Sequence, residues 1–142
     1  MPKRKANAEW KGTLQEGKGT MALGSGAFQG AYSFLSRFEE GTGTNPEELV
    51  GAAHAGCFSM ALSGALGKEG FNPQSVKTEA TVHLVKDESG FSVKEIDLEC
   101  EAQVPDIDEA KFREIAESAK QNCPISRLLT GAAIKLNARL KN

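Results

Sequence analysis

The chain has 142 residues, the usual size of one domain with one hydrophobic core, so we expect a single domain over residues 1–142. Hydrophobic residues make up 39% and charged residues 25%, as in soluble globular proteins, and a net charge of −2 offers no basic excess for binding nucleic acid. The basic start of the chain is not followed by the apolar stretch of a secretory signal, which predicts a cytoplasmic protein.

The first third of the chain is rich in glycine and predicts short strands joined by tight turns. Residues 6–14 alternate between apolar and polar side chains, which predicts a strand. After a Gly-Lys-Gly turn, we expect further strands within residues 19–23 and 28–38.

A long helix is predicted to begin at Pro46, because Asn45 can cap it, proline suits the first helical position and Glu48 can complete a capping box. The helix should run to about residue 68 and is apolar nearly all round. Glycine, serine and histidine dilute it too much for a good membrane span, so we expect no membrane contact. We expect a buried helix, covered by a sheet on one side and by another subunit on the other.

Glycines inside a helix cost about 1 kcal/mol each relative to alanine. This helix contains three interior glycines, namely Gly51, Gly56 and Gly64. We expect close backbone packing to compensate for them.

The C-terminal half predicts a hairpin, two helices and a last strand. Residues 75–85 alternate as a half-buried strand, a turn follows at 87–90, and a second strand reaches 104 with a β-bulge at Lys94 and Glu95. Asp106 and Asp108 can cap a helix over 109–121, and a short helix follows Pro124. Residues 134–140 alternate as the closing strand. The order of elements favours an α+β fold of antiparallel strands around a long central helix.

The three cysteines lie in different settings, and in a reducing compartment any disulfide between them is expected to be transient. Cys100 falls on the apolar face of a strand between two glutamates, where burial would raise its pKa, so we interpret it as core filler. Cys123 directly precedes a helix-starting proline, where free N–H groups favour a thiolate. Cys57 lies in mid-helix, so a reactive role requires a cation from elsewhere in the fold.

His54 lies three residues before Cys57 on the same helix face, which fits either a cysteine–histidine pair or a satisfied core histidine. A zinc site would have to draw on His54, Cys57, His83, Cys100 and Cys123. The absence of CxxC and HxxxH spacing argues against it.

Three segments together resemble one known family. They are SRFEEGTGTNPEELVGAAHAGCFSMAL at 36–62, VPDID at 104–108 and NCPIS at 122–126. Over nearly its whole length the chain resembles the osmotically inducible protein C (OsmC) family, within the OsmC and organic hydroperoxide resistance superfamily. The resemblance implies a cofactor-free thiol peroxidase for organic hydroperoxides, built as an intertwined homodimer with sites at the subunit interface. A dithiol, including one on a lipoylated protein, would reduce it.

The resemblance also implies roles for individual residues. Cys57 falls on the peroxidatic cysteine and Cys123 on the resolving cysteine. Arg37, whose position in SRFEE is similar to the OsmC branch, falls on the arginine that activates the thiol, and Glu47 falls on the residue that orients this arginine. Glu48 is the other carboxylate at this point, and we assign it to the capping box.

Helix geometry adds an expectation about the subunits. Glu47 and Cys57 are ten residues apart on one predicted helix, which separates them by about 15 Å along its axis. We therefore expect two copies of this helix to pack antiparallel, so that Glu47 serves Cys57 of the partner subunit.

Two other functions fit the same residues. A hydroperoxide sensor or binding protein would form the disulfide between Cys57 and Cys123 and stop after about one equivalent of peroxide, although no DNA-binding motif supports signalling. A dimeric scaffold with structural cysteines would consume peroxide equally well after a Cys57→Ser change.

Overall fold

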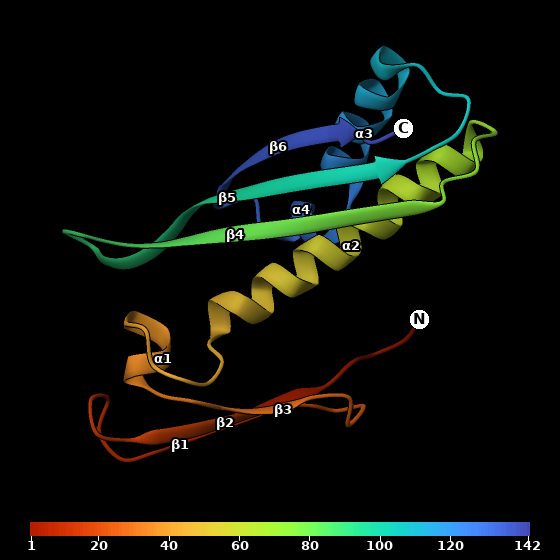
Figure 1. Cartoon of the computed structure of the whole chain (residues 1–142). Coiled ribbons are helices and arrows are strands. Elements are labelled where there is room, and N and C mark those ends of the chain that lie inside the picture. Colours follow the sequence, from red (N-terminus) through yellow and green to blue (C-terminus); the bar gives the residue numbers. More distant parts are fainter. The chain divides into compact units, whose positions relative to one another are not determined.

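The computed structural model describes all residues from 1 to 142, and these form two compact units, residues 1–49 and residues 50–142. Figure 1 shows the elements of both.

The first unit is built on a three-stranded antiparallel sheet of β1 (Ala6–Lys11), β2 (Lys18–Leu23) and β3 (Gln29–Tyr32), in the order β1-β2-β3. The prediction of strand over residues 28–38 is wrong in its second half, where the chain forms helix α1 (Phe34–Phe38). Ser33 and Ser36 explain the switch, because each side chain bonds the backbone N–H of the other in a capping box.

Helix α2 (Pro46–Lys68) has the predicted bounds, and its predicted cap is confirmed. The Asn45 side chain accepts a hydrogen bond from the backbone N–H of Glu48 at 2.7 Å. The capping-box role of Glu48 is wrong, because its carboxylate accepts a hydrogen bond from the Thr44 hydroxyl at 2.8 Å instead. A threonine hydroxyl one residue before the cap thus takes the place of the cap N–H as the donor to this carboxylate.

The second unit holds a mixed sheet of β4 (Ser75–Asp87), β5 (Gly90–Gln103) and β6 (Ala133–Leu140), in the order β4-β5-β6. β4 and β5 are antiparallel, but β6 runs parallel to β5, so the antiparallel prediction is wrong for the closing strand. The reason is the long connection through α3 (Glu109–Asn122) and α4 (Pro124–Leu128). It returns the chain to the N-terminal half of β5, so that β6 can run beside β5 in the same direction. The predicted bulge is confirmed, since the register between β4 and β5 shifts past Lys94.

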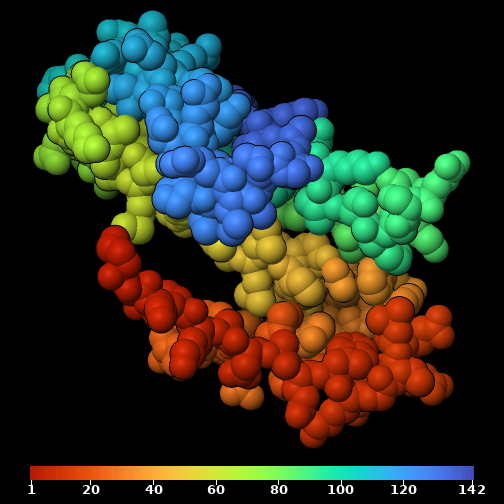
Figure 2. Space-filling model, turned by 180° about the vertical axis from the view of Figure 1, so that it is seen from behind, coloured from red at the N-terminus to blue at the C-terminus, as the bar shows by residue number.

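Helices cover one face of this sheet and leave the other polar. Figure 2 shows the helix side, with α3 and α4 in blue and the green tip of the β4–β5 hairpin projecting beyond them. The core joins α2, β5 and α3, and its largest members are Phe58, Leu62, Leu66, Ile96, Leu98 and Phe112. The predicted stripe of α3 is confirmed, because Phe112, Ile115, Ala116 and Ala119 are all buried.

The side of α2 that faces away from this core is open. Met60 is 79% exposed, and a Cβ atom on Gly56 or Gly64 would meet nothing within 4 Å. The expected close packing of glycines is therefore wrong within the chain for these two, whereas a Cβ on Gly51 would lie 3.4 Å from Val82. By length and composition α2 could also span a membrane, a test that core helices of soluble proteins pass as well.

Candidate functional site

The sulfur atoms of Cys57 and Cys123 lie 3.0 Å apart in the second unit. Cys57 is half-buried in the middle of α2, and Cys123 is fully buried at the N-cap of α4. Both are free thiols, because 3.0 Å is well beyond the disulfide bond length of about 2.05 Å. A small movement would nevertheless join them, and only Cys57 is open to a molecule from solvent.

The two thiols differ in acidity. Burial and the hydrogen bond with Cys123 raise the pKa of Cys57 above its ordinary value of 9.0, although a bond from the Ile125 N–H opposes this. Burial also raises the pKa of Cys123, but hydrogen bonds with Cys57, with the Ser126 N–H and hydroxyl and with the Ile125 N–H outweigh it, so its pKa is lowered. The two pKa values are thus shifted in opposite directions for two thiols that share one hydrogen bond.

His54 and Ser126 extend this pair through the core. The imidazole Nε2 of His54 lies 2.7 Å from the hydroxyl oxygen of Ser126, and both residues are buried. Burial lowers the pKa of His54. The structure thus connects His54 to the cysteine pair through Ser126. The sequence did not identify Ser126 as a functional residue. Ser126 could have been found from its position in the sequence. It lies three residues after the N-cap Cys123, and a side chain at this position of a helix can reach back toward the cap.

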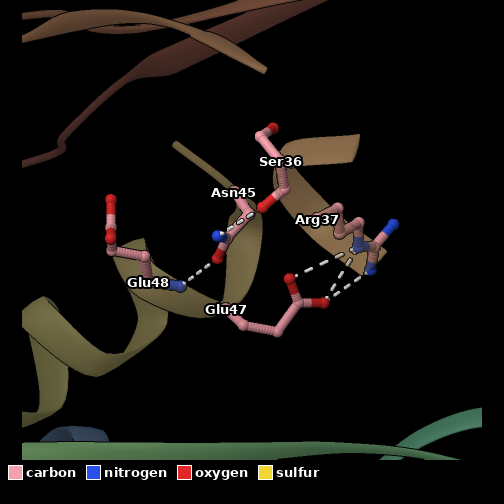
Figure 3. A network of polar contacts seen from close by, with 5 residues as sticks. All are labelled: Ser36, Arg37, Asn45, Glu47 and Glu48. Atoms are coloured by element: carbon pink, nitrogen blue, oxygen red, sulfur yellow. Dashed lines mark hydrogen bonds and ion pairs between the residues drawn. The ribbon is translucent and has the colours of Figure 1, made fainter. Parts of the chain in front are cut away.

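Arg37 and Glu47 meet in the first unit (Figure 3). Arg37 Nε donates to both carboxylate oxygens of Glu47, at 3.0 and 3.3 Å, and Nη2 donates to Oε1 at 2.8 Å. Glu47 is only 13% exposed at its side chain, and Arg37 is 36% exposed. The carboxylate therefore fixes the plane of the guanidinium, while Nη1 takes part in none of these bonds.

A hollow of about 320 Å³ lies beside Arg37 in the same unit. Half of its lining residues are aromatic, namely Trp10, Tyr32, Phe34 and Phe38, and Leu14 adds a further apolar side chain. Trp10 and Tyr32 pack with ring centroids 5.2 Å apart, which gives the wall a rigid apolar surface. The guanidinium is thus a charged group at the edge of an apolar space.

The remaining candidate residues lie elsewhere. Cys100 is buried on β5, where burial raises its pKa, as expected for core filler. His83 contacts Asp97 at 2.7 Å and Glu95 at 3.5 Å, and these three side chains form the only cluster whose ligand atoms could hold a metal ion. Lys135 also contacts Glu95, at 2.7 Å, and offsets part of the negative charge of this cluster.

The sequence has a clear set of relatives. The family profile described as OsmC-like protein matches residues 39–139. The peroxiredoxin OsmC of Escherichia coli is 49% identical over 140 residues, which cover 98% of this chain and 97% of the relative. The organic hydroperoxide resistance protein OhrB of Bacillus subtilis is 36% identical over 90 residues, which cover 63% of this chain and 65% of that protein.

Solved structures share the fold over the whole chain. The crystal structure of Bacillus subtilis OhrB has a TM-score of 0.68 at 26% identity, covering 96% of this chain and 98% of its own. An OsmC-like protein from Mycoplasma pneumoniae has a TM-score of 0.77 at 18% identity, covering 99% of both chains. The mixed sheets and the long helix of the present chain are thus those of a known fold.

Proposed function

The chain belongs to the OsmC-like family and is a thiol-dependent peroxidase, and we propose that it reduces organic hydroperoxides to alcohols through Cys57 and Cys123. One observation carries the proposal. The two sulfur atoms are 3.0 Å apart, and of the two only Cys57 is partly exposed. A partly exposed attacker beside a buried partner is the arrangement that a two-cysteine peroxidase needs.

The chemistry runs in three steps. The Cys57 thiolate attacks the terminal peroxide oxygen, the O–O bond breaks, and the alkoxide leaves and takes a proton to become the alcohol. Cys57 is now a sulfenic acid, and the Cys123 thiolate attacks its sulfur, so that an S–S bond forms and hydroxide leaves as water. A dithiol then reduces the disulfide by two exchanges, becoming a disulfide itself. We propose that lipoylated proteins are among these dithiols.

Cys57 needs help to act as the first nucleophile, because its pKa is raised while that of Cys123 is lowered. We propose that Arg37 supplies this help with a permanent positive charge. That charge favours moving the shared proton from Cys57 to Cys123, and the free Nη1 donors can meet the negative charge that develops on the peroxide. Glu47 keeps the guanidinium oriented for both tasks.

The aromatic hollow beside Arg37 suits the organic part of the substrate. Apolar walls favour an alkyl or aryl group over water, and a charged group at the edge favours the polar peroxide end. This combination supports organic hydroperoxides over hydrogen peroxide as preferred substrates.

We propose that the enzyme is a homodimer. Glu47 and Cys57 lie ten residues apart on one continuous helix, about 15 Å along its axis, so one helix does not place both on a single guanidinium. Two copies of α2 packed antiparallel through the open face around Gly56 and Met60 would solve this problem. Each site would then combine Cys57 of one subunit with Arg37 and Glu47 of the other.

Peroxide turnover and mass spectrometry test the proposal. Wild-type protein with cumene hydroperoxide and a dithiol should consume many equivalents, whereas a sensor would stop after about one. Cys57→Ser should abolish peroxide consumption. If the protein were a scaffold with structural cysteines, this change would leave consumption as it was. In Cys123→Ser, sulfenic acid or its oxidised products should accumulate on Cys57. Oxidation that falls first on Cys123 would contradict the assigned roles.

A further inference from the structure

A line of buried polar atoms runs from α2 to the resolving cysteine. His54 is 0% exposed, Ser126 is 4% exposed and Cys123 is 0% exposed. His54 Nε2 and Ser126 Oγ are 2.7 Å apart, and the Ser126 hydroxyl lowers the pKa of Cys123, as a donor to its sulfur would. Buried polar groups of this kind are costly unless they are satisfied, so their protons must fit together.

The serine hydroxyl has one proton to give. If it donates to the Cys123 sulfur, its oxygen must accept from His54, and the imidazole then carries its proton on Nε2. The other ring nitrogen, Nδ1, is buried and has no hydrogen-bond partner. An unpaired acceptor is tolerated there more readily than an unpaired N–H, which the opposite tautomer would create.

These contacts therefore run in one direction. The imidazole donates to the serine, and the serine donates to the sulfur. We propose that His54 and Ser126 are positioning residues that, once Cys57 is oxidised, hold Cys123 as a thiolate aimed at Cys57 for disulfide formation. This inference rests on the proposed peroxidase function. It concerns the formation of the disulfide and its later reduction, because the attack on the peroxide takes place on Cys57.

The same bonds matter when the disulfide is reduced. A dithiol attacks one sulfur, the S–S bond breaks, and the other cysteine leaves as a thiolate. Cys57 is the partly exposed sulfur, and the hydroxyl of Ser126 stabilises the thiolate that leaves from Cys123. The mixed disulfide with the reductant is therefore expected on Cys57.

Single-turnover kinetics tests the proposal. After one equivalent of cumene hydroperoxide, trapping with dimedone and mass spectrometry follow both the Cys57 sulfenic acid and the disulfide. In Ser126→Ala the sulfenic acid should form at least as fast as in wild-type protein, because the proton that the two cysteines share then rests more often on Cys123. The disulfide should form about tenfold more slowly, because a hydrogen bond to a charged sulfur is lost. His54→Leu should act in the same direction.

Conservative variants separate positioning from folding. Ser126→Thr keeps the hydroxyl and His54→Gln keeps an N–H donor, so both should restore most of the rate of disulfide formation. Ser118→Ala removes an exposed serine from α3 and serves as the matched control. A disulfide rate in Ser126→Ala equal to that of wild type would overturn the proposal.

Two measurements do not depend on turnover. In Cys57→Ser with Cys100→Ala, the pH at which the Cys123 thiolate forms, followed by its ultraviolet absorbance, should be higher when Ser126→Ala is added, because the thiolate loses a donor. Nitrogen-15 NMR of the wild-type protein should place the His54 proton on Nε2, and a proton on Nδ1 would sink the idea even if a variant failed to fold. If Cys57 never becomes oxidised in wild-type protein, the proposed peroxidase function is wrong. The titration of Cys123 and the tautomer of His54 still test whether His54, Ser126 and Cys123 are hydrogen-bonded as proposed.

Discussion

At the scale of single residues, two neighbouring carboxylates do different work. Glu47 takes three hydrogen bonds from Arg37, whereas Glu48 accepts from Thr44 and stays with the start of α2. Their formal charge and sequence position are nearly the same. Only the direction of each side chain separates them, as Figure 3 shows for Arg37 and both glutamates.

This pair supplies a matched test of arginine positioning. Glu47→Gln weakens charge-assisted bonds to Arg37, so the rate of Cys57 oxidation by cumene hydroperoxide should fall about 10- to 100-fold. Glu48→Gln leaves the guanidinium contacts intact and should stay within about twofold of wild type. Stopped-flow measurement of the first oxidation step compares them. If both variants lost the same fraction of the rate of Cys57 oxidation, Glu47 would not be the residue that orients Arg37.

At the scale of elements, local signals predicted most of the fold. The Asn45 cap placed α2, strict alternation placed β4 and β6, and the parity slip at Lys94 placed the bulge. These features depend on a few neighbouring residues, which the sequence displays directly. The direction of β6 depends instead on how a long connection returns to the sheet, and no local pattern encodes it.

The candidate site follows the same rule. The cysteines stood out because of their own neighbours in the sequence, but Ser126 gains its importance from His54, which lies 72 positions away in the chain. Likewise, α1 was missed because its apolar residues fit a strand as well as a helix, and the capping box of Ser33 and Ser36 decided between them.

Ser36 is the residue on which the α1 corner depends. It is 6% exposed, its hydroxyl donates to the Thr44 carbonyl at 2.7 Å, and its own carbonyl accepts from the Asn45 side chain at 3.0 Å. Ser36→Ala leaves the Thr44 carbonyl and the Ser33 N–H without this partner. The variant should lose about 1–3 kcal/mol of unfolding free energy. Urea denaturation measures the loss, and the rate of Cys57 oxidation should fall with it because Arg37 is the next residue.

An exposed serine provides the control for that loss. Ser25→Ala lies in a turn of the same unit and should change the unfolding free energy by less than about 0.5 kcal/mol. A Ser36→Ala protein as stable as this control would show that the corner does not depend on the hydroxyl.

At the scale of the whole molecule, the proposed site divides between two subunits. Arg37 and Glu47 are bonded to each other within one chain, so they act as one group. Cys57 and Cys123 form the second group, 3.0 Å apart. An antiparallel pair of α2 helices would bring the first group of one subunit to the second group of the other, twice per dimer.

Subunit mixing tests this division. Glu47→Gln and Cys57→Ser each damage a different group, and homodimers of either variant should be nearly inactive. If the groups meet across subunits, a mixed dimer regains one intact site, formed by Cys57 of the first variant and by Arg37 and Glu47 of the second.

Random exchange between equal amounts of the two variants should therefore restore about a quarter of wild-type turnover. The measurement is peroxide consumption with a dithiol before and after mild denaturation and refolding of the mixture. If both groups belonged to one subunit, every mixed dimer would carry two damaged sites and the turnover would stay at the level of the separate variants. Recovery thus depends on which subunit supplies Glu47, and size-exclusion chromatography with light scattering confirms in the same samples that dimers are present.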